Sequence, residues 1–114
     1  MAHWFKVVSV LATSEKWDAL TDGAARAIVN IWCYTAQHSP SEGRVPTNIH
    51  RLVPGVTPKR VEELEAGGWL DRNGTGWIVH DWHEHQSDVV AFERRRAKDR
   101  ERKAAKRREA SGEQ

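Results

Sequence analysis

The sequence predicts a mainly helical α+β domain over residues 1–86, followed by a basic helical or partly disordered tail over residues 87–114. Apolar residues recur at helical spacing before Gly67, and "GWLDR" and "GWIVHDW" then flank "NGTG" as the strands of a hairpin would. The charge is also distributed unevenly between the two parts of the chain. Residues 1–92 hold 8 Lys and Arg against 11 Asp and Glu, net −3, whereas residues 93–114 hold 10 against 5, net +5.

The N-terminal part predicts an arm, a helical turn and the main helix. "HWFKVVSV" is rich in β-branched and aromatic residues, which favours a short strand or an extended arm. "SEKWDAL" predicts a helical turn capped by Ser14, and "TDGAARAIVNIWCYTAQH" predicts a long helix capped by Thr21. Helical spacing places its apolar residues on one face: Ala25, Ile28, Val29, Trp32 and Ala36.

The next segment predicts a short extended link at "GRVP" and then a short helix. Thr47 is expected to cap this helix. Its apolar residues Ile49, Leu52 and Val53 share one face.

A second short helix is predicted within "VTPKRVEELEAGGWL". Thr57 is its expected cap, and Pro58 takes the first helical position, where its missing N–H costs nothing. Val56 can pack onto Val61 as a hydrophobic staple. The glycine pair 67–68 supplies a left-handed stop.

The predicted order is helix, short strand, helix, turn, helix and β-hairpin. This is the order of a winged helix-turn-helix, and the hairpin would be its wing.

The residues also resemble a known family. "WIVHDWHEHQ", "LEAGGWL" and "HWFKVVSV" are similar to the N-terminal winged-helix domain of phage replisome organisers and to related helix-turn-helix proteins of actinobacterial phages, over about residues 3–108. The most specific part is a strand ending in an acid or amide, then Trp, two variable residues and His-Gln, here Asp81, Trp82, His85 and Gln86. The resemblance implies a DNA-binding protein of the bacterial host cytoplasm, acting in replication initiation or transcriptional regulation.

DNA contact is expected from the second helix of the pair, whose N-terminal residues would meet base edges in the major groove. With Val61 and Leu64 buried, its outward positions are Lys59, Glu62, Glu63 and Ala66, with Arg60 on the flank. This face is mixed in charge, so most contacts are expected to go to phosphate. In the domain the expected DNA-binding residues are Arg51, Thr57, Lys59, Arg60, Arg72 and Asn73. In the tail they are Arg94, Arg95, Arg96, Lys98, Arg100, Arg102, Lys103, Lys106, Arg107 and Arg108.

The histidines of "HDWHEH" raise a metal alternative. A zinc site would use His80, His83 and His85, with Asp81 or Glu84 as a fourth ligand. Neighbours on a strand point to opposite faces, so these ligands could converge only if the chain bent sharply. The favoured interpretation is structural. Trp77 and Val79 would face the core, His80 would face water, and Trp82 would close the base of the domain.

No enzyme, cofactor or resident metal is expected. Asp81 and His83 could form an acid and base pair, but no serine or cysteine nucleophile stands nearby in the sequence. No glycine-rich phosphate loop follows a strand.

Double-stranded DNA is the expected partner, with replication or transcription proteins as further candidates. The alternative is a protein-interaction adaptor that docks on that machinery without binding DNA. "VVSVLA" is too short to span a bilayer and lacks the pattern of a secretory signal. The single cysteine, Cys33, lies among apolar residues and is expected to pack in the core. A cytoplasmic protein without a membrane partner is therefore predicted. Its oligomeric state and target DNA sequence are left open.

Overall fold

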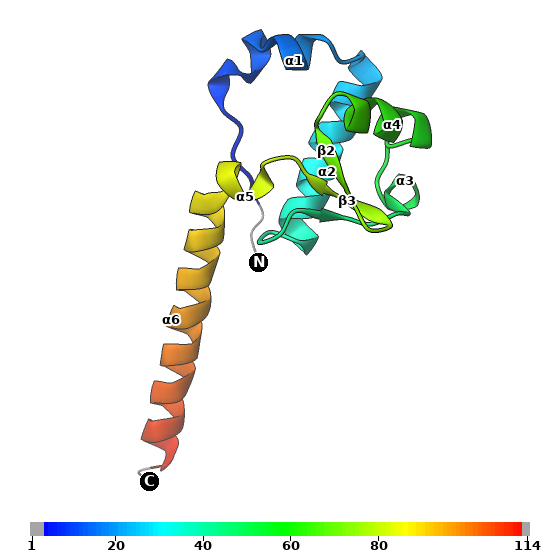
Figure 1. Cartoon of the computed structure of the whole chain (residues 1–114). Coiled ribbons are helices and arrows are strands. Elements are labelled where there is room, and N and C mark those ends of the chain that lie inside the picture. Colours follow the sequence, from blue (N-terminus) through cyan, green and yellow to red (C-terminus); the bar gives the residue numbers. More distant parts are fainter. Residues whose placement is uncertain (1–3, 113–114) are drawn as a thin grey trace.

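The computed structural model describes the backbone of residues 4–112, and the side chains of that range apart from residues 87–90, 92–93 and 110–112. The fold is α+β and mostly helical, with one small antiparallel sheet (Figure 1). A 3₁₀ helix, η1 (Ser9–Thr13), precedes the α-helices, which are α1 (Glu15–Asp18), α2 (Asp22–His38), α3 (Ile49–Leu52), α4 (Pro58–Ala66), α5 (Trp82–His85) and α6 (Ser87–Gly112). The strands are β1 (Arg44–Val45), β2 (Leu70–Asn73) and β3 (Gly76–Val79).

Helix α2 carries much of the core. Its predicted cap is confirmed, because the Thr21 hydroxyl oxygen accepts a hydrogen bond from the Ala24 N–H at 3.2 Å. The buried face consists of Ala24, Ala27, Ile28, Ile31, Thr35 and Ala36. The predicted face was therefore wrong in part: Ala25 and Trp32 are half-buried, and Val29 is 36% exposed. Spacing alone left the rotation of the helix about its axis open, and the contacts of α2 with α4 and β1 fix it.

Cys33 is exposed, so the prediction that it packs in the core was wrong. The reason is the same rotation of α2, because Val29 and Gln37, one turn away on either side, are exposed too.

Of the expected short strand or extended arm, the strand is not formed: residues 4–8 have no regular secondary structure and η1 follows. The Ser14 cap of α1 is confirmed by a 3.4 Å hydrogen bond from the Trp17 N–H. Trp17 stacks on Trp32 with ring centroids 6.2 Å apart and meets the edge of Trp69 at 5.7 Å. These aromatic contacts attach the N-terminal segment to α2.

The loop before α3 differs from the prediction. Asn48, not Thr47, precedes the helix, and its side chain makes no capping hydrogen bond. The Thr47 hydroxyl instead donates to the Thr75 carbonyl at 2.8 Å. Thr47 therefore fastens this loop to the hairpin tip. Ile49 and Val53 are buried as predicted, whereas Leu52 is 49% exposed.

Helix α4 begins and ends as predicted, with one correction. The Thr57 hydroxyl oxygen accepts from the Arg60 N–H at 3.2 Å. At the C-terminal end, the Gly68 N–H donates to Glu65 at 3.1 Å and the Trp69 N–H donates to Leu64 at 2.8 Å, which is a Schellman motif. Only Gly68 is left-handed, at φ +79°. The preceding glycine keeps a helical φ of −79°.

The sheet has the strand order β1-β3-β2, so the last strand lies in the middle (Figure 1). In the β2–β3 hairpin, Asn73 pairs with Gly76, which leaves a two-residue loop. Gly74 opens this loop at φ +60°, a conformation that glycine adopts without strain. Trp77 and Val79 are buried and His80 is exposed, as predicted.

The last strand was expected to end at Asp81 and to lead into a linker, and this was wrong in part. Strand β3 stops at Val79, Asp81 turns the chain at φ +54°, and α5 follows. Trp82 is 3% exposed, and its indole N–H donates to the Pro40 carbonyl at 2.8 Å. The early loop and the end of the hairpin are joined there.

Gln86 connects the N-terminal arm to the base of α6. Its side-chain oxygen accepts from the Lys6 N–H at 2.7 Å, and its amide donates to the Lys6 carbonyl at 2.8 Å. The side chain thus pairs with the arm as a neighbouring strand would. We call this contact the Gln86 clamp.

Helix α6 runs away from the rest of the chain as a single rod (Figure 1). Its 26 residues correspond to about 39 Å of length. It gives the molecule extents of 64 × 30 × 23 Å and a radius of gyration of 18.0 Å, against roughly 13 Å for a compact chain of this length. Within the described residues no helix is both long and apolar enough to cross a membrane.

Candidate nucleic-acid interface

The outward face of α4 is small. Val61 and Leu64 are buried as predicted, and Lys59, Glu62 and Ala66 are exposed. The charged side chains of this outward face are therefore one lysine and one glutamate three residues apart. On α3, Arg51 is exposed as well.

Glu63 was expected on the outward face, and the structure places it elsewhere. Its carboxylate accepts from the Thr21 N–H and from the Thr21 hydroxyl, each at 2.9 Å. It therefore stabilises the N-terminus of α2, where a negative charge is favourable. It does not neutralise Lys59.

Arg60 is half-buried and makes contacts inside the domain. Its Nη1 donates to the Gly55 carbonyl at 2.6 Å. Its guanidinium also lies against Gly23, where an added Cβ would come within 2.6 Å of Nε. This arginine holds the turn before α4 against the start of α2, so a phosphate contact through it would compete with these interactions.

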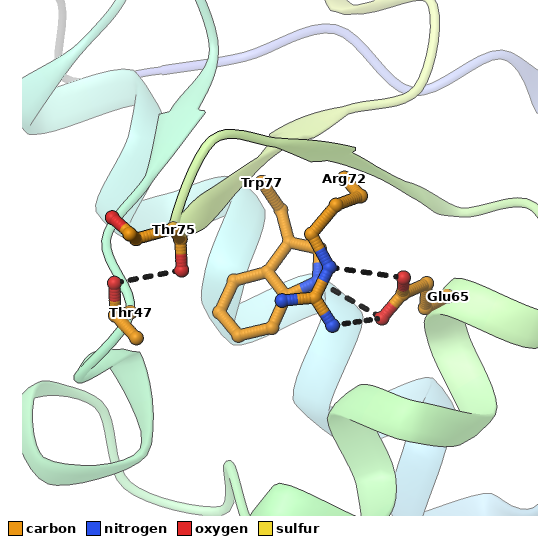
Figure 2. A network of polar contacts seen from close by, with 5 residues as sticks. All are labelled: Thr47, Glu65, Arg72, Thr75 and Trp77. Carbon is orange, nitrogen blue, oxygen red and sulfur yellow. Dashed lines mark hydrogen bonds and ion pairs between the residues drawn. The ribbon is translucent and has the colours of Figure 1, made fainter.

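Arg72 belongs to a network that joins α4 to the hairpin (Figure 2). Its Nε and Nη2 donate to the two carboxylate oxygens of Glu65, both at 3.2 Å, and its guanidinium lies 5.1 Å from the ring centroid of Trp77. The Trp77 indole N–H donates to the same carboxylate at 3.1 Å. The Arg72 side chain is 57% exposed, so it faces solvent while its position is fixed.

The hydrogen bond from Trp77, and then that from Arg72, hold the pKa of the Glu65 carboxyl below its ordinary value of 4.5. A lowered folded-state pKa means that Glu65 stabilises the fold above the ordinary carboxyl range, and that this contribution is lost as the pH falls through the lowered pKa.

We therefore expect Glu65→Gln to unfold at lower urea concentration than the wild type at neutral pH, and the two unfolding midpoints to converge below pH 4.5. Urea titrations at several pH values measure this. Glu62→Gln removes the same charge from the exposed face of α4 and is expected to change stability little. A Glu65→Gln deficit that stays constant with pH would contradict the prediction.

A groove lies beside the hairpin tip, and only one of the residues that line it was expected from the sequence. Asn73 lines it as one of the expected DNA-binding residues. Tyr34, His38 and Arg44 line it too, and the rings of Tyr34 and His38 have centroids 4.3 Å apart. These residues come together through the pairing of β1 with β3, which local sequence patterns do not encode.

Helix α6 presents the densest positive charge. All side chains from Arg94 to Glu109 are exposed, including the ten basic residues expected to bind DNA. Asp99 pairs with Arg102 at 3.4 Å. Most of the charge between Arg94 and Glu109 is therefore directed at solvent.

The histidine segment does not form a single cluster. His80 contacts Asp71 through Nδ1 at 2.8 Å and Asp81 through Nε2 at 3.2 Å. His83 and His85 lie on α5 and are exposed. Among the side chains that the structure describes, no group of three or more His, Cys, Asp or Glu residues is placed to hold a metal ion.

Taken by position, the expected DNA-binding residues fall into two groups. Arg51, Lys59, Asn73 and the tail residues are exposed. Thr57, Arg60 and Arg72 make hydrogen bonds within the domain, although Thr57 and Arg72 are exposed too. An exposed row of cations suits binding of a polyanion. Comparisons with protein families, with curated proteins and with solved structures found no match to this chain.

Proposed function

We propose that the chain is a winged-helix protein that binds double-stranded DNA mainly through phosphate contacts. The order α2-β1-α3-α4-β2-β3 and the sheet order β1-β3-β2 support this fold. In a helix-turn-helix the second helix, here α4, lies in the major groove. The β2–β3 hairpin would then be the wing beside it.

One observation carries the DNA-binding proposal, namely the exposed basic side chains of α6 from Arg94 to Arg108. Duplex DNA carries about one negative charge per 1.7 Å of axis, with condensed counterions that a cationic protein displaces. A rod of about 39 Å with ten exposed lysine and arginine residues between positions 94 and 108 is suited to that displacement.

The folded domain offers fewer positive charges than α6, and its contacts would mainly orient the protein on the duplex. Lys59 at the start of α4 lies beside Glu62, so attraction to phosphate is partly offset on this face. Arg51, Thr57, Arg72 and Asn73 are the further candidate contacts. Such contacts position a protein on the duplex without selecting its sequence.

The cellular role proposed is replication initiation or transcriptional control in the cytoplasm of a bacterial host. It rests on the resemblance of the Asp81, Trp82, His85 and Gln86 pattern to phage replisome organisers.

The test is a titration of the full chain into duplex DNA across a salt series, followed by fluorescence anisotropy. We expect the logarithm of the affinity to fall linearly with the logarithm of salt, by about 0.9 per phosphate neutralised. With roughly 6–10 contacts, affinity should fall by about 10³–10⁵ between 50 and 200 mM salt. No duplex binding at 50 mM salt would refute the function.

The same titration measures how much α4 contributes to DNA binding. Lys59→Ala is expected to reduce the salt slope by about one, and Glu62→Gln, three residues away on the same face, to raise affinity. If neither substitution changes binding, α4 does not face the DNA.

A second candidate function is docking on a protein of the replication or transcription machinery. One observation favours it: the N-terminal arm exposes large apolar side chains, with Trp4 48%, Val7 51%, Val8 43% and Val10 67% exposed. The salt titration separates the two functions, since an adaptor of this kind would not bind duplex DNA at low salt.

A further inference from the structure

The basic residues of α6 are unevenly distributed around its axis. At about 100° per residue, one half of the circumference between positions 94 and 109 holds seven basic residues and one acidic residue, net +6. We call this half the basic face: Arg95, Arg96, Asp99, Arg100, Arg102, Lys103, Lys106 and Arg107. The other half, the mixed face, has three basic and two acidic residues, net +1: Arg94, Ala97, Lys98, Glu101, Ala104, Ala105, Arg108 and Glu109.

The basic face contains a straight stripe. Arg96, Arg100, Lys103 and Arg107 recur at intervals of four, three and four residues, so they lie one above another along about 16 Å of the helix. The stripe lies near one margin of the face, and Arg95, Arg102 and Lys106 follow the other margin. The face therefore has two rows of cations.

The mixed face does not suggest a helical partner instead. Ala97 and Ala104 are seven residues apart, but no apolar position between them completes a heptad seam. Its acidic residues, Glu101 and Glu109, would repel phosphate. This face has neither the apolar seam of a coiled coil nor the charge of a DNA-binding surface.

We propose that α6 lies in the major groove of a DNA duplex with its basic face toward the DNA and its mixed face toward solvent. This inference rests on the proposed function and adds the orientation of the helix. An α-helix is about 10–12 Å across and the groove is about 12 Å wide. Two rows of cations on one half of the helix can then reach the phosphates on both sides of the groove.

The shape of the molecule is consistent with this placement. The part of the chain before α6 has a net negative charge, which phosphates repel, and α6 extends beyond it into solvent (Figure 1). The rod can then lie along a groove while the acidic domain meets the duplex only through α4 and the hairpin.

Two full-length variants with identical changes in composition and charge test the orientation. Arg100→Gln, Lys103→Gln and Arg107→Gln together alter the basic face, and Arg94→Gln, Lys98→Gln and Arg108→Gln together alter the mixed face. Glutamine is a good helix former, so circular dichroism should show equal helicity. Affinity for duplex DNA of unrelated sequences is measured across the salt series.

We expect the basic-face variant to lose affinity on the order of 100-fold at 0.1 M salt, with a salt slope smaller by about 2.7. The mixed-face variant should keep a slope within about one of the wild type. Equal losses in both variants, or no loss in either, would overturn the orientation while leaving DNA binding intact. Equal affinity of the wild type for single-stranded DNA would overturn the groove placement. No binding by the wild type would instead refute the proposed function.

Discussion

Trp82→Ala is expected to lower the free energy of unfolding by about 3–5 kcal/mol, the usual cost of removing a buried aromatic side chain. Trp82 is 3% exposed and packs against Gly43, and its N–H satisfies the Pro40 carbonyl at 2.8 Å. Its loss leaves a cavity and an unpaired carbonyl where the early loop meets the end of the hairpin. Urea unfolding followed by circular dichroism measures the change.

Trp82→Phe and a substitution at an exposed residue provide the controls. Phenylalanine keeps most of the apolar contact and loses the hydrogen bond, so a smaller cost of about 1–3 kcal/mol is expected. Val10→Ala, at a side chain that is 67% exposed, should change stability by less than about 0.5 kcal/mol. If Trp82→Ala costs no more than Trp82→Phe, the packing described for this side chain is wrong.

Gly43→Ala is expected to destabilise the fold by about 2–5 kcal/mol, through two separable causes. Gly43 has φ +69°, which costs other residues about 1–2 kcal/mol. An added Cβ would also come 2.5 Å from Trp82 Cγ, and such overpacking costs about 1–3 kcal/mol more.

A double-mutant cycle separates these causes. In a Trp82→Ala background the steric conflict is gone, so Gly43→Ala should cost only the conformational part, about 1–2 kcal/mol. Gly74→Ala is the matched control, because Gly74 has φ +60° and nothing within 4 Å of an added Cβ. Strict additivity of Gly43→Ala and Trp82→Ala would show that the two residues are not in contact.

The elements that the sequence predicted best are those specified locally. Thr21 and Thr57 cap helices because a side chain three residues before an N–H can reach it, whatever the rest of the fold does. The hairpin at Gly74 follows in the same way from the conformational freedom of glycine.

The parts that failed depend on contacts between distant segments. Glu63 was expected as an outward charge on α4, but its partner Thr21 is 42 positions away at the start of α2. Arg60, expected on the flank, lies against Gly23 of α2. The rotation of α2 and the exposure of Cys33 depend likewise on which face α4 and the sheet cover. Spacing within one helix holds no information on these contacts.

The candidate site was predictable in part for the same reason. The tail residues form an exposed helix, as a polar sequence of good helix formers indicates. Its basic face follows from the register of that helix. The groove beside the hairpin did not follow, since Arg44 and Tyr34 meet Asn73 only through strand pairing and packing.

The Gln86 clamp joins the two ends of the folded domain through hydrogen bonds and not through a covalent bond. The segment from Lys6 to Gln86 is thus a closed loop of chain, here called the ring. Lys6 and Gln86 are 80 positions apart, and their two hydrogen bonds join the start of this ring to its end. The rod of α6 leaves the ring at that junction. Opening at either Lys6 or Gln86 breaks the same two hydrogen bonds, so we expect the arm and the Gln86 side chain to open together.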